Sequence, residues 1–329
     1  MEKIEKYIPS LHIKASNLPE ACWKAIEAVQ NRGYELRTQY DRKDSYGNFI
    51  DPPGRDAKVM IQIDDTFKSP RYPLIGFSEL GKIIAEYLGA KDHLVPSYET
   101  LYKLVEKARS ENRKVKDEET LWPYTYFWRL TNYPTHDGKT INQLENMIND
   151  LARNPITRRA VAITAVPEID QYLEADQPCL RQIQLRLIEN ENREFLLYMD
   201  LTWRSRDLIK AWSDNIIGIT NLHSRLAHEL SEKIGKEVKV GPYYEYNSSL
   251  HIYGQDYTDK KFIPEVFFKK YPSAEAFVNK CKEIEEFLRD KIIDDLEKLK
   301  KESTWKFPIS SIKLIEKLID DFKSGRFIP

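Results

Sequence analysis

The feature that most constrains the fold of this chain is a change in its hydrophobic period near residue 157. The preceding segment, TINQLENMINDLARNP at 140–155, repeats apolar residues at helical spacing. The segments that follow are short and either β-branched or alternating: AVAITAV at 160–166, RQIQLRL at 181–187 and EFLLYMDLTW at 194–203. A helix followed by three such strands predicts an α/β protein of the α+β type, with one main mixed sheet flanked by helices.

The segment 140–155 is the clearest helix in the sequence. We expect Thr140 to be its N-cap and Pro155 to follow its end. Its apolar side would contain Ile141, Leu144, Met147, Ile148 and Leu151. In RQIQLRL, the isoleucine and the leucines alternate with glutamines and an arginine, so one face of that strand should be buried.

Helices and strands alternate through the rest of the chain. A polar loop that contains the PPG of residues 52–54 leads into a strand at 58–63. Further helices are expected at 77–93, 99–114 and 218–235, and a polar-aromatic strand, YYEYNSSLHIYG, at 243–254. His223 and His228, on or near the packed face of the last helix, are expected to be core or surface residues. The sequence has no internal repeat and no glycine-rich turn of the phosphate-cradling kind.

From about residue 265 onward the pattern is almost wholly helical. One apolar stripe on a charge-rich helix would contain Phe277, Cys281, Ile284, Leu288, Ile292 and Leu296. A second helix, SSIKLIEKLIDDFKSG, is expected at 310–325. We therefore expect two parts, a main α/β domain at 1–265 that carries the catalytic site, and a helical C-terminal extension at 266–329 that packs on it.

Composition narrows the classes of partner. The 329 residues contain 51 Lys+Arg and 52 Asp+Glu, so the net charge of -1 offers no long-range attraction to nucleic acid or anionic lipid. The N-terminal segment lacks the apolar core of a signal peptide, and no stretch approaches the roughly 18 apolar residues that span a bilayer. We expect a soluble cytoplasmic protein without a membrane or nucleic-acid partner.

The three cysteines, Cys22, Cys179 and Cys281, are widely spaced and form no CxxC pair, which argues against a disulfide framework or a metal site. Cys22 and Cys281 lie on expected helix faces and should be structural. Cys179 follows Pro178 and comes just before the strand RQIQLRL, an edge position open to a ligand. It would react as a thiolate, which needs positive charge nearby to lower a free pKa of about 8.5.

Three arginines supply candidate charges. Arg158 and Arg159 stand at the entrance to one strand, and Arg204 ends another. Guanidinium groups suit phosphate because their planar fork makes two parallel charge-assisted hydrogen bonds. Considered without the cysteine, the same arginines would fit a solvated charged edge, so both interpretations stay open.

The order of these residues resembles the thymidylate synthase family. An Arg-Arg pair about twenty residues before a Pro-Cys dipeptide is followed by the run RSRD at 204–207. Asn215 comes eight residues after Asp207, and the pattern His251-x-Tyr253 follows it. Each motif is weak alone, but the combined order and spacing are specific.

Two further segments carry the resemblance. NPITRR is similar to the family's NPxSRR, and WPYTYFWR to its VYGxxWR, with Tyr124 and Trp128 at matching positions. The resemblance covers roughly residues 120–257. It implies a thymidylate synthase-like fold and a covalent mechanism in which the Cys179 thiolate adds to C6 of the pyrimidine of a nucleotide monophosphate.

The same resemblance implies a reaction and its co-substrate. C5 of the pyrimidine would take a one-carbon unit from 5,10-methylenetetrahydrofolate or a pterin analogue, which converts dUMP to dTMP without a metal. Arg204 and Ser205 would hold the phosphate, and Arg158 and Arg159 would reach the same phosphate from a partner subunit. A homodimer would therefore be required for activity.

The remaining roles concern the base, the sugar and proton transfer. Asn215 would bind the pyrimidine edge, and His251 and Tyr253 would hold the sugar hydroxyl. Asp207 would lie near the folate, and Tyr124 would assist proton removal at C5. Each of these roles is implied by the resemblance alone.

The family's catalytic glutamate is matched best by Glu86 in IAEYLG, with Glu79 in FSELG as the alternative. Leu180 replaces the histidine that usually follows PC, WSDN stands where PFN is usual, and NSSLHIY replaces GDxHxY. The SLHIY form is closer to the deoxycytidylate hydroxymethylase branch, whose members carry aspartate at the Asn215 position. Asn215 at this position makes uracil our expectation, and the adjacent Asp214 keeps cytosine as the alternative.

Two other functions stay open. The family's apolar C-terminal tail, which closes over folate, is replaced by a lysine- and glutamate-rich region that ends in GRFIP. A wetter site would let water rather than hydride finish the reaction, which would give a 5-hydroxymethylase of dUMP, dCMP or a ribonucleotide. A homologue that binds nucleotide or RNA without turnover is the alternative from another class.

Overall fold

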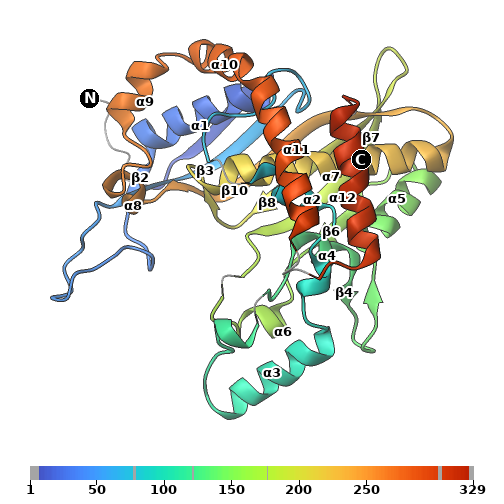
Figure 1. Ribbon diagram of the computed structural model, residues 1–329, viewed down its shortest axis with the longest axis horizontal. Helices are drawn as coiled ribbons and strands as arrows, with labels where there is room; N and C mark the ends of the chain where they lie inside the picture. The colour runs from blue at the N-terminus through green and yellow to red at the C-terminus, as the bar shows by residue number, and fades with distance from the viewer. Residues whose placement is uncertain (1–6, 77–78, 121, 176, 303–305, 326–329) are drawn as a thin grey trace. The chain divides into compact units, whose positions relative to one another are not determined.

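The computed structural model of the protein describes residues 7–76, 79–120, 122–175, 177–302 and 306–325 (Figure 1). The final RFIP and the first two residues of FSELG lie outside the described residues. The chain forms two compact units. The first contains Met1–Ser78, Thr202–Ile217 and Gly241–Arg289, and the second contains Glu79–Leu201, Gly218–Val240 and Asp290–Pro329. The chain passes between them inside β8 (Phe195–Trp203), α7 (Ala211–Ile234), β10 (Val238–Ile252) and α11 (Glu285–Lys301).

The main sheet has the strand order β1-β3-β10-β8-β7-β6, with β2 beside β3 and β9 beside β10. The other bounds are β1 (Ser10–Ala15), β2 (Tyr34–Leu36), β3 (Gly54–Ile63), β6 (Val161–Ile163), β7 (Leu180–Glu189) and β9 (Arg206–Asp207). β1 runs parallel to β3, whereas β10 runs antiparallel to β3, and β6 antiparallel to β7. The sheet is therefore mixed, and the three strands predicted after residue 157 are confirmed.

In the first unit, α1 (Leu18–Arg32) packs on β1 and β3 (Figure 1). Asn17 caps this helix, since its Oδ1 accepts a hydrogen bond at 3.0 Å from the backbone N–H three residues on. The helix buries Leu18, Pro19, Ala21, Cys22, Ala25, Ile26 and Val29. α10 (Ala274–Glu283) packs along α1 and buries Phe277 and Cys281. The shorter helices of this unit are α8 (Gly254–Thr258) and α9 (Pro264–Lys270).

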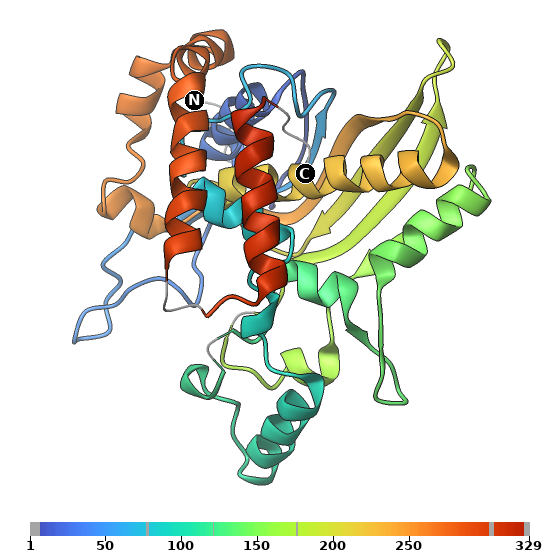
Figure 2. The same ribbon diagram turned by 45° about the vertical axis from the view of Figure 1, so that its right-hand side comes forward.

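The second unit is mainly helical around its strands. Its helices include α2 (Leu80–Tyr87), α3 (Tyr98–Ser110), α4 (Tyr126–Thr131), α5 (Gln143–Arg153), α6 (Pro167–Asp170) and α12 (Ile309–Lys323), with the short 3-10 helices η1 (Asp92–Leu94) and η2 (Asp117–Glu119). α11 and α12 lie side by side (Figure 2), joined by the ion pairs Lys300–Glu316 at 2.6 Å and Lys323–Glu297 at 2.7 Å. The predicted helical C-terminal region is thus present.

The N-terminus of α5 corrects one prediction. Thr140 is not the N-cap, because Thr140–Ile141 forms the short strand β5, which pairs with β4 (Tyr133–Pro134). Asn142 caps the helix instead, and its Oδ1 accepts from Glu145 N at 3.1 Å. Ile141 is 41% exposed, so the buried side of α5 begins with Leu144. An Asn next to the first turn reaches the exposed N–H groups that Thr140 was expected to satisfy.

Two further helices differ from their predicted extents. The apolar stripe that begins at Phe277 does not lie on one helix, because the chain breaks at Ile284 between α10 and α11. Buried side chains nevertheless continue across this break, so the periodicity alone did not reveal it. The helix predicted at 218–235 begins at Ala211, which places WSDN in the first turns of α7.

His223, on α7 in the second unit, is a core residue, as predicted. Its ring is fully buried, and Nε2 donates to the backbone oxygen of Leu197 at 2.7 Å. Burial lowers the pKa of His223 from 6.5 to about 4. The folded protein therefore holds this imidazole neutral over a pH range in which the unfolded chain protonates it.

We predict a pH-dependent loss of stability from this residue. Above the unfolded pKa of 6.5 the ring is neutral in both states, so the free energy of unfolding keeps its full value. As the pH falls toward the folded pKa of about 4, only the unfolded chain binds the proton, and the free energy of unfolding decreases. Across that window the free energy of unfolding should fall by about 3 kcal/mol more in the wild type than in His223→Gln. Urea denaturation of both proteins at several pH values measures this, and parallel pH profiles would refute it.

Candidate functional site

The predicted site residues fall into two groups, one in each unit. Arg204, Ser205, Asp207, Asn215, His251 and Tyr253 belong to the first unit. Glu86, Tyr124, Arg158, Arg159 and Cys179 belong to the second. Strand pairing positions part of each group, and helices and loops carry the rest.

In the first unit, strand pairing places His251 between two carboxylates. His251, near the end of β10, lies opposite Asp56 of β3 and opposite Asp207 of β9. Ser249 precedes it by two residues and therefore points to the same face of the strand. We call Asp56, Asp207, Ser249, His251 and Tyr253 the β10 cluster.

Hydrogen bonds and burial define the chemistry of the β10 cluster. Ser249 Oγ donates to Asp56 Oδ2 at 2.6 Å and lies 3.2 Å from His251 Nδ1. Burial lowers the pKa of His251, although Asp207 and Asp56 act in the opposite direction. Burial also raises the pKa of Asp56, against the hydrogen bond from Ser249. The imidazole is therefore a neutral hydrogen-bonding group rather than a cation.

The backbone next to Tyr253, which follows β10, packs closely against the segment that contains Pro52. A Cβ on Gly254 would lie 1.9 Å from the backbone oxygen of Pro52, so only glycine fits there. The Tyr253 ring meets the His251 ring edge-on at 4.4 Å between centroids, and it meets Tyr40 at 5.8 Å. These contacts hold the rings of His251 and Tyr253, which were predicted to act together, next to each other.

In the run RSRD, Arg206 belongs to the core, whereas Arg204 lies nearer the surface. The Arg206 side chain is fully buried, pairs with Glu245, donates to Trp212 O at 3.2 Å and stacks on Trp203 at 4.1 Å. Glu245 also accepts from Tyr243, Trp212 and Asn247. Arg204 and Ser205 are half-buried, so Arg204 is the arginine of this run that solvent can reach.

Asp207 and Asn215 lie at either side of the start of α7. Asp207 Oδ1 accepts from the backbone N–H groups of Ile209 and Lys210, both at 3.0 Å. Asn215 is half-buried on α7, whereas the preceding Asp214 is 7% exposed. Successive residues of a helix point about 100° apart, so these two side chains face different directions.

In the second unit, Cys179 stands immediately before β7. The neighbours Pro178 and Leu180 are buried, whereas Cys179 is half-buried, with Sγ 4.0 Å from Gln177 O. Cys179 is therefore less buried than the other two cysteines and stands at the start of an anchored strand. The other cysteines differ, because burial raises the pKa of Cys22 and raises that of Cys281 to about 12.

Two tyrosines lie near this thiol. Burial, with smaller contributions from Tyr124 and Cys179, raises the pKa of Tyr126 well above its usual range. The Tyr126 hydroxyl is therefore a neutral group whose pKa is influenced by the Cys179 thiol. The Tyr124 ring lies 5.8 Å from the Tyr126 ring, and the Arg129 guanidinium lies 5.6 Å from the Tyr124 ring centroid. Tyr126 was missed in the sequence because only Tyr124 matched a family motif.

A second set of side chains in this unit surrounds Glu86. Glu86 Oε2 pairs with Lys91 Nζ at 2.9 Å, and Lys91 lies 5.1 Å from the Trp122 ring centroid. Burial, together with the charge of Glu86, raises the pKa of Asp92 to about 7. Thr125 Oγ1 donates to Asp92 at 2.6 Å. Asp92 was not predicted, since nothing in the local pattern distinguishes it from a surface carboxylate.

Glu79, the alternative to Glu86, has a different environment. It forms ion pairs with Lys82 at 2.8 Å and Lys298 at 2.9 Å, and those lysines lower its pKa to about 2. Such a partly exposed, fully paired carboxylate is typical of a surface salt bridge. The assignment of Glu86 or Glu79 as the functional glutamate stays a prediction.

Arg158 and Arg159 are exposed and lie away from Cys179 in the same chain. The side chain of Gln184 donates to Arg158 O at 3.0 Å, and Gln184 pairs with Val161 in the β6–β7 ladder. Cys179 is five residues from Gln184 along the strand, which corresponds to roughly 16 Å. This distance is too long for either guanidinium to contact the sulfur of its own chain.

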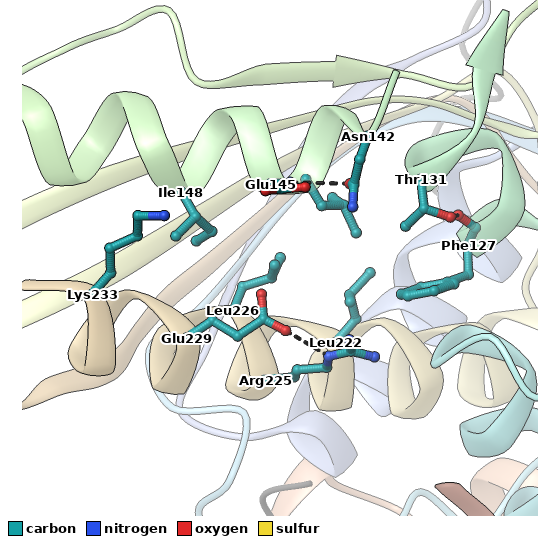
Figure 3. Close-up of a pocket in the computed structure, with 11 residues that line it drawn as sticks. Phe127, Thr131, Asn142, Glu145, Ile148, Leu222, Arg225, Leu226, Glu229 and Lys233 are labelled. Carbon is teal, nitrogen blue, oxygen red and sulfur yellow. Dashed lines mark hydrogen bonds and ion pairs between the residues drawn. The ribbon is translucent and has the colours of Figure 1, made fainter. Parts of the chain in front are cut away.

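A groove in the second unit contains none of the predicted catalytic or nucleotide-binding residues (Figure 3). It lies between α5 and α7 and is lined by Phe127, Thr131, Asn142, Leu144, Glu145, Ile148, Leu222, Arg225, Leu226, Glu229 and Lys233. Its charges are partly paired, since Arg225 Nε donates to Glu229 at 2.8 Å. In the described part of the chain, no three His, Cys, Asp or Glu side chains are grouped to hold a metal. Every helix described is too short or too polar to cross a membrane.

Comparison with known proteins identifies the family. Residues 104–327, more than half of the chain, match the family model described as thymidylate synthase. The chain belongs to the thymidylate synthase family. A protein of Methanocaldococcus jannaschii named "Putative thymidylate synthase" is 36% identical over 196 residues, which cover 57% of this chain and 81% of that protein. A protein of the same name from Methanosarcina barkeri is 30% identical over 246 residues, 74% of this chain and 90% of its own.

A solved structure, thermostable thymidylate synthase A from Bacillus subtilis, aligns with a TM-score of 0.49 and 16% identity over 75% of this chain and 83% of that one. The thymidylate synthase family match reaches residue 327 and so includes most of the predicted C-terminal extension. The division of the chain at residue 265 stays a prediction.

We predict that Cys179 is the first cysteine to be alkylated. Iodoacetamide should add one equivalent to the native protein, because the other two thiols are buried and their pKa values are raised. Peptide mass spectrometry locates the label, and Cys179→Ser should abolish it. Equal labelling of all three cysteines in the native state would contradict this prediction.

We also predict that the two arginines of RSRD have separate roles. Arg206→Met should lower the free energy of unfolding by about 3 kcal/mol, because Glu245 would keep a buried charge without its main counterion. The matched variant Arg204→Met should change it by less than about 1 kcal/mol. Urea denaturation measures both values, and similar losses in the two variants would show that the assignment is wrong.

Proposed function

We propose that this protein transfers a one-carbon unit from methylenetetrahydrofolate, or a pterin analogue, to C5 of a pyrimidine nucleotide monophosphate. The reaction we expect is the methylation of dUMP to dTMP. The observation that carries the proposal is the half-buried Cys179 at the start of β7, whose thiol contributes to the raised pKa of Tyr126, in a chain of the thymidylate synthase family.

The Cys179 sulfur would begin the reaction by forming a bond to C6 of the pyrimidine. This addition makes C5 nucleophilic, so that C5 can form the new carbon–carbon bond. The C5 proton and the folate nitrogen must then leave, a hydride from tetrahydrofolate must reduce the transferred carbon to methyl, and the sulfur is expelled from C6. Tyr126, whose hydroxyl stays protonated, and the adjacent Tyr124 would relay that proton.

The surroundings of Glu86 fit the co-substrate. Methylenetetrahydrofolate supplies the one-carbon unit at the methylene oxidation level. Its pterin is a flat, nitrogen-rich heterocycle, which suits the carboxyl groups of Glu86 and Asp92 and the indole face of Trp122. Because the pKa of Asp92 is about 7, this carboxyl can hold or release a proton near neutral pH.

Binding of the nucleotide would use the predicted residues of the first unit. Arg204 and Ser205 would hold the phosphate, Asn215 the pyrimidine edge, and His251 with Tyr253 the sugar hydroxyl. Asp207, which is held by two backbone hydrogen bonds, would lie near the folate. The neutral state of the His251 ring supports a hydrogen-bonding role at the sugar.

A second copy of the chain would complete each site. Arg158 and Arg159 lie next to Gln184 of β7, and Gln184 is roughly 16 Å along the strand from Cys179 of the same chain, which supports their use by a partner subunit. Apolar residues are also exposed on the strands of each unit, as a homodimer interface requires. These residues are Met60 and Tyr246 in the first unit and Val161 and Ile163 in the second.

A 5-hydroxymethylase is the second candidate. The SLHIY form of the motif favours it, because that form resembles the deoxycytidylate branch, and a shift of the motif by one residue would put Asp214 at the Asn215 position. Water would then complete the reaction in place of hydride, and the base would be cytosine or uracil. We expect either enzyme to act in the cytoplasm, with residues 1–265 as the catalytic domain and 266–329 as the helical extension.

Product analysis tests these proposals. The protein should add a methyl group to dUMP in the presence of methylenetetrahydrofolate, and mass spectrometry of the nucleotide would show it. 5-Fluorodeoxyuridylate with the folate should leave a covalent adduct on Cys179. Cys179→Ser should lose both activities, whereas Cys22→Ala should keep them because that thiol is fully buried in the first unit.

The same assay separates the alternatives. A hydroxymethyl product, or activity with dCMP, would contradict the methylation of dUMP and support the 5-hydroxymethylase instead. Saturable nucleotide binding without product or adduct would indicate a binding protein and would overturn both enzymatic proposals.

A further inference from the structure

Two buried acceptor atoms near the end of β10 need hydrogen-bond donors. Among the residues that the structure describes, His251 Nε2 and Asp56 Oδ1 have no hydrogen-bond partner. Both residues are only 7% exposed. Buried polar atoms are rarely left unpaired, so such atoms indicate a position that a ligand or an ordered water fills.

The hydrogen bonds around Ser249 determine which nitrogen of His251 carries the proton. The Ser249 hydroxyl has a single proton, which it donates to Asp56 Oδ2 at 2.6 Å. Its oxygen also lies 3.2 Å from His251 Nδ1, so it must accept a hydrogen bond from Nδ1–H there. Because the ring is neutral, Nε2 is left with a lone pair.

We propose that Asp56 and Ser249 are positioning residues that hold His251 in its Nδ1–H tautomer, so that Nε2 accepts a hydrogen bond from the sugar hydroxyl of the nucleotide. The inference rests on the proposed function and deepens it. It adds two residues behind the imidazole and gives the direction of the hydrogen bond.

The charges around His251 favour a hydroxyl over a phosphate. Asp56 faces the ring from β3 and Asp207 faces it from β9, while Arg204 is the cation that acts on it. Two carboxyl groups and an unprotonated nitrogen would repel a phosphate but attract a hydroxyl proton. The phosphate is therefore expected at Arg204 and the sugar hydroxyl at His251.

Strand register explains how the chain provides this carboxyl group. Ser249 stands where the family motif GDxHxY, quoted above, has aspartate. Asp56 lies opposite His251 in the β3–β10 ladder, so the neighbouring strand supplies a carboxyl that reaches the imidazole through the serine hydroxyl. Opposite residues of an antiparallel pair lie close enough for this contact.

Nucleotide binding with and without the hydroxyl tests the proposal. Titration calorimetry would compare deoxyuridylate with 2′,3′-dideoxyuridylate, which lacks the 3′ hydroxyl. The wild type should bind deoxyuridylate about tenfold more tightly, the factor expected for one hydrogen bond. Ser249→Ala and Asp56→Ala should lose most of that preference while they bind the dideoxynucleotide normally. Ser248→Ala is the matched control and should keep the preference.

A spectroscopic measurement reads the tautomer directly. Imidazole ¹⁵N shifts of histidine-labelled protein distinguish a protonated from an unprotonated ring nitrogen, and His251→Gln assigns the signal among the six histidines. The wild type should show Nδ1–H and a bare Nε2, and Ser249→Ala should shift this equilibrium. Circular dichroism establishes whether each variant is folded. If Asp56→Ala does not fold, Ser249→Ala alone is sufficient for the test.

The possible results separate this inference from the proposed function. If the wild type binds neither nucleotide, the proposed function fails, and the inference fails with it. If the wild type binds deoxyuridylate but Ser249→Ala weakens the binding of both nucleotides equally, only the inference about the tautomer is overturned. A protonated Nε2 in the wild type would overturn it too, because Asp56 would then be the donor to Ser249.

Discussion

Much of the candidate site in the first unit depends on the register of β10. This strand pairs with β3 on one side and with β9 on the other, and both pairings place a carboxylate opposite His251. The register shifts between Asn247 and Leu250, just before the cluster. A slip of one residue would turn His251 to the opposite face of the sheet, away from its partners.

Burial has opposite consequences at two places in the molecule. At Arg206 and Glu245 the buried charges are paired and surrounded by donors, so they are part of the core. At Asp92 burial raises the pKa of the carboxyl to about 7, against the hydrogen bond from Thr125. The first arrangement belongs to the core, whereas the second is suited to proton exchange near neutral pH.

The sequence predicted the elements better than the contacts between them. Alternation identified β7, and helical spacing identified α5, because periodicity records which face is buried. It did not predict the N-cap of α5, since Thr140 and Asn142 are both competent caps and only the β4–β5 pairing excludes Thr140. The order of motifs identified the residues of the proposed site, although the roles of those residues remain predictions.

The residues that sequence reasoning missed share one property. Tyr126 and Asp92 are ordinary in their local sequence, and their altered pKa values come from burial and from neighbours in the folded unit. Asp56 was missed because its partner is brought to it by strand pairing rather than by a motif. Such relationships depend on register, which a single sequence does not determine.

The pairing of Asp56 with His251 also has a consequence for folding. The two residues are nearly two hundred positions apart, so their contact closes a very long loop. Contacts of this kind form late, because the chain must lose much entropy before they become favourable. During synthesis, β3 must wait for β10 with one edge unpaired, and the β10 cluster can form only after most of the chain has left the ribosome.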